Sequence, residues 1–518
     1  MRNSQILISV ASLLSSAFAT SISARDKQQP NILFIMADDH DSKAISAYRS
    51  GLNKTPNIDR IAQEGMLFRN CFVTNSISGP SRAAIMTGKF SHKNGFYDNR
   101  AGVQFDGSQQ TFPKLLQAAG YQTAVIGKWH LGSTPTGFNY YSIHIGQGTY
   151  YSPEFLEPQG KKNYTGAYAT DITLENSLKW LSQADKSKPF CLMMQFKAPH
   201  RNWMPAVEKM TMYEDHTFPV PANFFDDYAN RRAAKEQQMS IEKSMNLAGD
   251  LKLLGYKNSE MGETLENELN RMTPAQRAAF EKVYLPIKDQ FDSEKLTGKT
   301  LTLWKYQRYM RDYMKCISSV DDNVGKMIDY LKANGLWENT IVVYTSDQGF
   351  YLGEHGWFDK RFMYEESFHT PLLVSYPKMI KKGIETKSLA QNIDFAATLL
   401  DFAGVKIPAD VQGESLKPIL CQTKQKVRDA LYYHYYEFPQ PHAVKRHYGI
   451  RTDRYKLIHF YDNINEWELY DLKNDPSEMK NEINNPEFAK IKRTMKVDLH
   501  KLQKKYDDTD PTKNYLMN

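Results

Sequence analysis

Four stretches of the chain are apolar on consecutive positions instead of alternating with polar ones. They occupy residues 31–40, 123–132, 190–200 and 340–349. A strand that helices cover on both faces of a sheet has this continuous pattern. Helical patterns lie between these stretches, for example over 55–65 and 319–335. The alternation predicts an α/β fold, in which a large doubly wound, mostly parallel sheet is flanked by helices.

Two other parts of the chain have a different pattern. Residues 204–300 are charged and rich in Met and Glu, which predicts a helical insertion on the surface of the main domain. From residue 426 onwards, aromatic alternating runs predict an antiparallel sheet with hairpin turns, followed by a terminal helix over 487–505. The predicted organisation is a large α/β domain over 28–425 and a smaller C-terminal antiparallel-sheet subdomain over 426–518.

The first residues have the pattern of a cleavable export signal. Arg2 precedes an apolar run from Ile6 to Phe18, and small residues stand at Ala17 and Ala19. We therefore predict a signal peptide over 1–19, and a protein that is exported to the periplasm of a Gram-negative bacterium or secreted. No later stretch approaches the length of a membrane span.

Composition narrows the class of protein. The chain has 518 residues and a formal net charge of +7, without a dense stripe of Lys and Arg, which argues against a nucleic-acid partner. Its aromatic content of 12% suits a protein that stacks on sugars, as well as ordinary cores. The four cysteines have no metal-type spacing, and their pairing is left open by the sequence. They are Cys71, Cys191, Cys316 and Cys421.

Each of the four apolar runs ends in polar residues of types that can bind a metal ion, carry charge or transfer a proton. These are Asp38 and Asp39, Lys128 and His130, His200, and Asp347 and Gln348. Ligands of an open parallel sheet bind beyond the carboxyl ends of its strands. The four endings therefore predict one site at that edge.

Ser78 stands at a predicted helix N-terminus, in the stretch "SGPSRAAIMTG" over 78–88. Pro80 suits a first helical turn and Gly88 ends the pattern. A helix N-terminus attracts anions, and Arg82 adds a planar cationic fork. Ser78 is thus placed where an oxyanion would be stabilised, although a serine at such a position is also an ordinary helix cap.

Several motifs together resemble the formylglycine-dependent type I sulfatases of the alkaline-phosphatase-like superfamily. "SGPSR" with Thr87 and Gly88 resembles the family signature. The supporting motifs follow the family's order over most of 30–490: "ADDH", "TPNIDRIAQEG", "GKWHLG", "SDQG" and "GEHGWFDKRFMYEE". The resemblance implies that a maturase, here of the radical type that accepts Ser, oxidises Ser78 to formylglycine (3-oxoalanine). The hydrated aldehyde would then be the nucleophile.

The resemblance also implies roles for the other polar residues. Arg82 and Lys128 would hold the formylglycine hydrate and the sulfate oxygens. His130 would take a proton from the second hydroxyl, and His200, with Lys360, would protonate the leaving sugar oxygen.

The resemblance further implies a metal site. Its ligands would be Asp38, Asp39, Asp347, Gln348 and an oxygen of residue 78, and an all-oxygen set of this kind favours Ca²⁺, with Mg²⁺ as second choice. The family more often has Asn or His where Gln348 stands.

"KAPHRNW" and "GEHGWFDKRFMYEES" resemble the subgroup that removes the 6-O-sulfate of N-acetylglucosamine. The expected partner is a sulfated glycan, such as heparan sulfate, keratan sulfate or a mucin-type glycan, and the expected state is a monomer or weak oligomer. The substrate-binding residues would be Asp359, Arg361 and His447, the last on a loop that also carries His442 and Lys445. The alternatives are a sulfatase of other regiospecificity, a two-zinc phosphodiesterase or phosphatase of the same fold, and a glycan-binding protein with unmodified Ser78.

Overall fold

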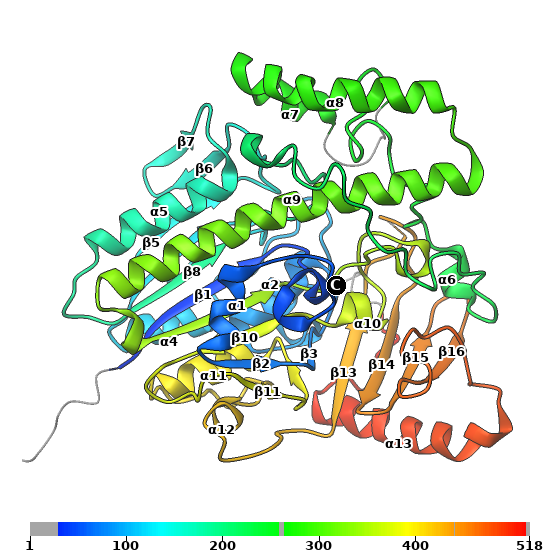
Figure 1. Cartoon of the computed structure of the whole chain (residues 1–518). Coiled ribbons are helices and arrows are strands. Elements are labelled where there is room, and N and C mark those ends of the chain that lie inside the picture. Colours follow the sequence, from blue (N-terminus) through cyan, green and yellow to red (C-terminus); the bar gives the residue numbers. More distant parts are fainter. Residues whose placement is uncertain (1–28, 258–263, 440, 514–518) are drawn as a thin grey trace, which may run out of the picture.

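The computed structural model describes residues 29–257, 264–439 and 441–513 (Figure 1). The predicted signal peptide over 1–19 lies outside the described residues. Along the described residues, no helix is both long enough and apolar enough to cross a membrane.

A ten-stranded sheet forms the centre of the molecule, in the order β11-β2-β10-β9-β1-β8-β4-β5-β6-β7. Its middle consists of four parallel strands: β9 (Thr340–Ser346), β1 (Asn31–Ala37), β8 (Phe190–Gln195) and β4 (Gln122–Gly127). These are the four apolar runs of the sequence. Because the four strands are parallel and adjacent, their carboxyl ends meet at one edge of the sheet.

The flanks of the sheet are partly antiparallel. On one side lie β10 (Leu372–Ser375), β2 (Met66–Phe68) and β11 (Ile384–Thr386), and on the other β5 (Tyr140–His144), β6 (Glu154–Glu157) and β7 (Gly160–Asn163). β10 is antiparallel to both of its neighbours, and β6 is antiparallel to β5 and β7. β3 (Cys71–Phe72) and β12 (Ala390–Gln391) form a separate parallel pair.

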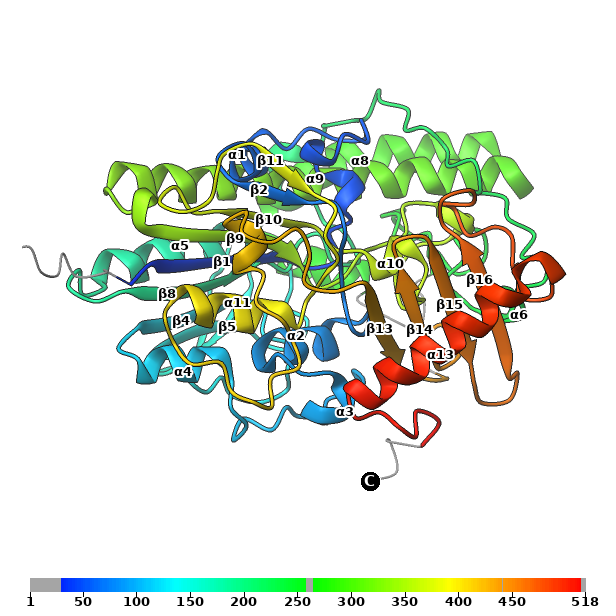
Figure 2. The same ribbon diagram turned by 90° about the horizontal axis from the view of Figure 1, so that it is seen from below.

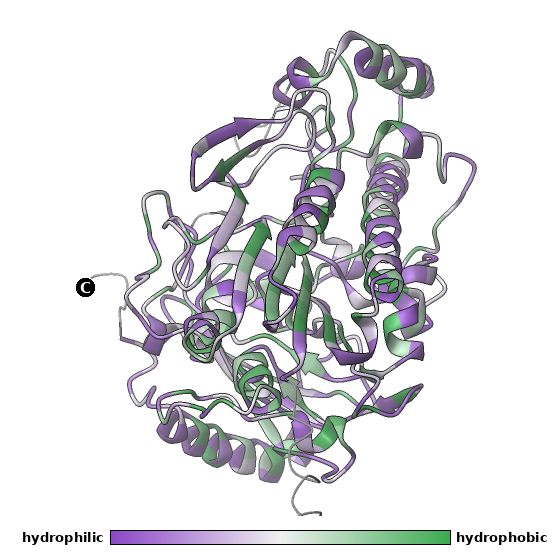
Figure 3. Cartoon of the chain, turned by 90° about the vertical axis from the view of Figure 1, so that its left-hand side faces the viewer, coloured by the Kyte–Doolittle hydropathy of each residue, from purple (hydrophilic) through white to green (hydrophobic). Residues whose placement is uncertain are grey.

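Helices cover both faces of the sheet (Figure 2). α1 (Pro56–Gln63), α5 (Ala169–Gln183) and α9 (Gly298–Ala333) pack on one face. α2 (Ser78–Thr87), α4 (Phe112–Ala118) and α11 (Asp394–Phe402) pack on the other. Leu33 of β1 belongs to the first core and Phe34 to the second. Both faces are therefore apolar, which agrees with the hydrophobic colouring along the central strands in Figure 3, and the predicted doubly wound α/β fold is confirmed.

The segment 204–300 contains α6 (Arg232–Glu236), α7 (Leu265–Arg271) and α8 (Pro274–Glu294), and α7 and α8 lie beyond α9, away from the sheet (Figure 1). α9 is much longer than the predicted helix over 319–335. The prediction was too short because the amino-terminal half of α9 is buried under this segment, which the local pattern did not reveal.

The C-terminal part has the predicted antiparallel sheet, with β13 (Ala430–Tyr435), β14 (His447–Thr452), β15 (Tyr455–Phe460) and β16 (Glu466–Asp471) in sequence order, and α13 (Ala489–Lys505) beside it. The short elements are α3 (Ser91–Asn94), α10 (Glu365–Phe368), α12 (Lys417–Leu420) and the 3₁₀ turns at 42–44, 46–48, 207–209, 337–339, 354–356 and 486–488. All four cysteines are free thiols in the structure.

Candidate active site

The strand ends bring the predicted polar residues together. Asp38 and Asp39 follow β1, and Asp347 and Gln348 follow β9. Lys128 follows β4 directly, and its backbone N–H donates to Gln195 O of the neighbouring strand at 2.7 Å. All five of these polar residues were predicted from the sequence, whereas Gln195 was not.

Ser78 lies at the same edge and is the first residue of α2, since the N-cap is Ile77. Its Oγ donates to Asp38 Oδ1 at 3.2 Å, and the residue is buried. The next residue, Gly79, has no room for a side chain, because an added Cβ would lie 2.5 Å from Asn99 Oδ1. The Gly79 N–H donates to that oxygen at 3.1 Å. The packing of Asn99 against Gly79 therefore fixes the start of the helix beside Ser78.

Three buried carboxylates at this edge are each paired with a buried cation. Asp38 pairs with the Lys128 ammonium group. Arg82 Nη2 lies 3.0 Å from Asp347 Oδ2, and Lys360 Nζ lies 2.7 Å from Asp39 Oδ2. Because an unpaired charge in this environment would be very unfavourable, each pair depends on both of its members.

The pKa values reflect how closely the carboxylates are crowded. The pKa of Asp39 is raised to about 7, because burial and the negative charges of Asp38 and Asp347 together outweigh the opposing effect of Lys360. Burial and the Asp38 charge also raise the pKa of Asp347. Asp38 itself is held well below its usual pKa, because Lys128 and the other cations outweigh its burial. A cation placed among these three carboxylates would be stabilised by all of them.

The donor set fits a divalent metal ion. Gln348 donates its amide N–H to Asp39 Oδ1, and its buried Oε1 has no hydrogen-bond partner among the described residues. Asp38, Asp39 and His200 also offer ligand atoms within 4.8 Å of one another. Carboxylate and amide oxygens are typical ligands of hard cations. Within the described part of the chain this is the one cluster of three or more acidic, His or Cys groups suited to a metal, whereas a two-zinc enzyme would need a further cluster.

Two histidines lie beside the charged cluster. His200 Nδ1 donates to Arg201 O at 2.6 Å, which leaves Nε2 directed to Asp39 Oδ2 at 3.9 Å. His130 Nε2 accepts from Gln147 Nε2 at 3.0 Å. Burial and the nearby Lys128 charge hold the pKa of both rings well below the usual range. Each ring therefore favours the neutral form unless an anion is bound beside it.

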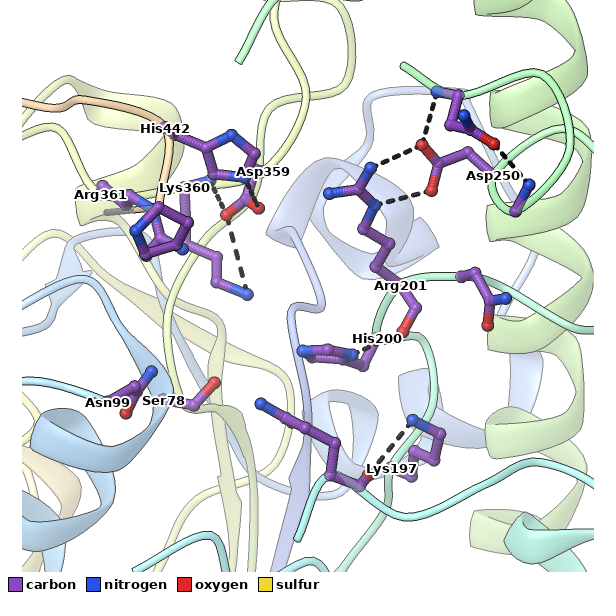
Figure 4. Close-up of a pocket in the computed structure, with 15 residues that line it drawn as sticks. Ser78, Asn99, Lys197, His200, Arg201, Asp250, Asp359, Lys360, Arg361 and His442 are labelled. Carbon is purple, nitrogen blue, oxygen red and sulfur yellow. Dashed lines mark hydrogen bonds and ion pairs between the residues drawn. The ribbon is translucent and has the colours of Figure 1, made fainter. Parts of the chain in front are cut away.

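A cavity of about 250 Å³ opens above Ser78 (Figure 4). Asp359, Lys360 and Arg361 line one side of it together with His442, which donates from Nε2 to Asp359 Oδ2 at 2.9 Å. Lys360, Arg361 and His442 hold the pKa of Asp359 well below its usual range against the effect of burial. The structure thus joins Ser78, His200, Asp359, Lys360 and Arg361 in one cavity.

Other lining residues were not predicted as site residues. They are Asn99, Gln147, Lys197, Arg201, Asn202, Asn246, Gly249, Asp250 and Pro441. Lys197, Arg201 and Asn202 belong to "KAPHRNW", so their nearness to His200 in the sequence was an available signal. Asn246, Gly249 and Asp250 come from the segment 204–300, whose sequence carries no recognisable motif.

His447 does not reach the cavity, contrary to the prediction that it binds substrate. It is fully buried, and its Nδ1 donates to Lys445 O at 2.7 Å. Its Nε2 accepts from the backbone N–H of Met363 at 3.1 Å. The prediction was wrong in position because His447 is the first residue of β14, and its ring packs in the core against Phe362 and Phe460.

The C-terminal sheet holds the chain segment that follows Arg361. Besides the bond from Met363 N–H to His447, Lys456 Nζ donates to Met363 O at 2.7 Å, so both polar backbone groups of Met363 are bound by buried side chains. Tyr433 Oη donates to Arg361 O at 2.6 Å. The position of Asp359 and Arg361 in the cavity therefore depends on the small sheet.

Comparisons with known proteins identify the class of this site. The sulfatase family model matches residues 30–405, and the model for the C-terminal part of N-sulphoglucosamine sulphohydrolase matches residues 353–505. The chain therefore belongs to the sulfatase family, as its motifs indicated, and it is a sulfuric ester hydrolase.

Three relatives are similar over most of the chain. An N-acetylglucosamine-6-O-sulfatase of Bacteroides thetaiotaomicron is 50% identical and covers 98% of this chain and 92% of its own. An N-acetylglucosamine-6-sulfatase of Capra hircus is 28% identical and covers 77% of this chain and 64% of its own. The solved structure of BT4656 in complex with its substrate D-glucosamine-2-N,6-O-disulfate has a TM-score of 0.90 and 51% identity, and the match covers 93% of this chain and 99% of that one.

The hydrogen bonds of His447 give a first prediction. His447→Leu leaves the Met363 N–H buried without an acceptor, which should destabilise the protein by about 1–3 kcal/mol. Hydrogen exchange of the segment 361–365 should become faster and the thermal unfolding midpoint should fall. His447→Gln can present an oxygen near the position of Nε2 and should recover part of the protection. Unchanged exchange of this segment in His447→Leu would show that the bond to Met363 does not hold it.

Proposed function

We propose that the chain hydrolyses the 6-O-sulfate ester of N-substituted glucosamine in sulfated glycans, such as heparan sulfate, keratan sulfate or mucin-type glycans. The observation that carries this proposal is the 50% identity, over 98% of the chain, to an N-acetylglucosamine-6-O-sulfatase. The similarity to a structure that holds a 6-O-sulfated glucosamine supports it further.

Ser78 is the proposed precursor of the nucleophile, after a maturase has oxidised it to formylglycine. One hydroxyl of the aldehyde hydrate attacks sulfur, and the bond from sulfur to the sugar oxygen breaks. Removal of the proton from the second hydroxyl then breaks the bond between the formylglycine carbon and the oxygen that now carries the sulfate, which releases sulfate and restores the aldehyde. An unmodified serine would instead leave a stable sulfate ester. The position of Ser78 beside Asp38, at the start of α2, supports this role.

The surrounding residues supply charge and protons. Arg82 and Lys128 are buried at the Ser78 edge of the sheet and would stabilise the negative charge that develops on the sulfate oxygens. His130, neutral through burial, would accept the proton of the second hydroxyl. His200 would protonate the leaving oxygen, since a bound sulfate beside it favours the protonated ring. Lys360 lines the same cavity as His200 and would assist it in protonating the leaving oxygen.

Ca²⁺ is the proposed metal, with Mg²⁺ second. Asp38, Asp39, Asp347, the Oε1 atom of Gln348 and an oxygen of residue 78 would hold it, and their oxygens and buried positions suit a hard cation. When bound, the ion would draw electron density from the sulfate and offset the crowding of the three carboxylates.

Sugar recognition is assigned to Asp359 and Arg361, which would bind the ring hydroxyls at C3 and C4. Their places in the cavity, with His442 bound to Asp359, support this assignment. Arg361 in turn forms an ion pair with Glu437, with 3.2 Å between Arg361 Nη1 and Glu437 Oε2. We further propose that residues 1–19 direct export to the periplasm and that the enzyme is a monomer or weak oligomer.

The substrate proposal predicts a preference among monosulfated sugars. The chain should hydrolyse N-acetylglucosamine 6-sulfate faster than galactose 6-sulfate and faster than 2-O- or 3-O-sulfated sugars. The axial O4 of galactose would leave a buried charged partner unpaired, which corresponds to a roughly ten- to hundredfold lower kcat/KM. Asp359→Ala should narrow this preference, and the exposed Asp453→Ala serves as control. Chromatography of the desulfated products gives the rates, and equal turnover of galactose 6-sulfate would contradict the proposed substrate.

The nucleophile proposal predicts a mass change at residue 78. Formylglycine is lighter than serine by about 2 Da, the mass of two hydrogen atoms, so mass spectrometry of the peptide over 70–89 from active enzyme should find this loss. Ser78→Ala should abolish turnover and leave the fold intact, because a small residue at a helix start costs only ~1 kcal/mol. Normal turnover by Ser78→Ala would place the nucleophile elsewhere.

Metal removal gives a further prediction. Chelation should abolish activity and lower the thermal unfolding midpoint, and Ca²⁺ should restore both, because a ligand that binds only the folded state stabilises it. Asp347→Asn should weaken the Ca²⁺-dependent rise of the midpoint. A metal-depleted protein with full activity and an unchanged midpoint would contradict the assigned ligands.

A further inference from the structure

Arg201 lies on the side of the cavity that faces Asp359 and His442. Figure 4 shows Arg201 and Asp250 on one side, Asp359, Arg361 and His442 on the other, and Ser78 at a distance below them. The proposed chemistry at Ser78 and the proposed sugar contacts of Asp359 and Arg361 leave Arg201 without a task. Its place in the cavity wall nevertheless puts a permanent positive charge within reach of a bound sugar.

The guanidinium group of Arg201 is held in a fixed orientation. Nε donates to Asp250 Oδ1 at 2.6 Å and Nη2 donates to Asp250 Oδ2 at 2.7 Å. On another side the group lies over the ring of Phe358, at 5.0 Å from the centroid. The Asp250 carboxylate also accepts from the backbone N–H of Asn246 at 2.8 Å. Both carboxylate oxygens of Asp250 thus accept hydrogen bonds, and the planar guanidinium group of Arg201 that they bind cannot rotate freely.

One nitrogen of this group remains available. Nη1 of Arg201 donates to no residue in the part of the chain that the structure describes. The Arg201 side chain is 16% exposed, compared with 3% for its partner Asp250. Since Arg201 lines the cavity, the exposed part of its side chain is accessible to a ligand there, and Figure 4 shows the guanidinium group directed towards the cavity.

The shape of the sugar indicates which group would meet Arg201. In a pyranose ring C2 lies directly opposite C5, the carbon that bears the sulfated C6. With the 6-sulfate at Ser78 and the hydroxyls at C3 and C4 against Asp359 and Arg361, the substituent at C2 extends away from Ser78. The far wall with Arg201 is the part of the cavity left for it.

We propose that Arg201, oriented by Asp250, binds an oxygen of the group on the C2 nitrogen and makes the enzyme selective for 2-N-sulfonated over 2-hydroxyl sugars. The inference rests on the proposed 6-O-sulfatase function. An anionic sulfonate forms a stronger, charge-assisted hydrogen bond with guanidinium than a neutral acyl oxygen does. A hydroxyl at C2 is shorter and does not carry the charge. The expected order of affinity is 2-N-sulfonate, then 2-N-acetyl, then 2-hydroxyl.

The test measures binding in a Ser78→Ala background, so that no turnover occurs. Isothermal titration would compare D-glucosamine 2-N,6-O-disulfate with D-glucose 6-sulfate. The disulfate should bind at least roughly tenfold more tightly, and adding Arg201→Gln should reduce this ratio by about tenfold or more. Two further variants should each give an intermediate ratio. Arg201→Lys keeps the positive charge but removes the planar guanidinium group, and Asp250→Asn keeps Arg201 but weakens the contacts that orient its guanidinium group.

Arg277→Gln is the matched control, since Arg277 pairs with Glu281 on α8 and does not line the cavity. It should leave the ratio unchanged, and thermal unfolding midpoints would establish that each variant is folded. An equal ratio with and without Arg201, or no preference for the disulfate in the Ser78→Ala parent, would overturn the inference.

The outcome can be separated from a failure of the proposed function. If the wild-type chain hydrolyses no 6-sulfated glucosamine, the proposed function is wrong. The ratio of the two dissociation constants still decides whether Arg201 binds the group at C2.

Discussion

The site depends on the balance of three buried carboxylates and three buried cations at one sheet edge. Asp38, Asp39 and Asp347 are fully buried, and Lys128, Lys360 and Arg82 pair with them. Removing one member of a buried pair leaves an uncompensated charge, which commonly costs about 3–5 kcal/mol. Because the carboxylates follow β1 and β9, whereas the cations come from three other segments, the balance is reached only when the whole sheet and its loops are in place.

Two separate parts of the chain complete the cavity around this centre. The C-terminal sheet holds the segment after Arg361 through His447 and Lys456, which bind both polar backbone groups of Met363. The segment 204–300 contributes Asp250, which orients Arg201 on the opposite wall. The proposed reacting centre therefore lies at the strand ends, and peripheral segments build the cavity walls that we propose face the sugar. The two parts of the cavity come from different elements of the fold, so the walls can differ without a change at the strand ends.

The sequence by itself determined which polar residues gather at one edge of the sheet. A polar residue directly after a buried strand, such as Asp38 after β1 or Asp347 after β9, can be recognised from the neighbouring sequence alone. Parallel strands then place all of these residues at one edge of the sheet. The start of α2 at Ser78 and the four-stranded C-terminal sheet followed from local patterns in the same way. These features were predictable because each depends on residues close together in the chain.

Only the tertiary structure decided the walls. Arg201 and Asp250 are separated by 49 residues, and Met363 and His447 by 84, so no local pattern pairs them. His447 was predicted to bind substrate because it was taken to share a loop with His442 and Lys445, yet the register of β14 turns its ring into the core beside Tyr433 and Phe460. The full length of α9 likewise depends on the insertion that covers its first half. Which side chain faces the cavity is set by strand register and by long-range packing, and a linear pattern of polar and apolar residues does not contain that information.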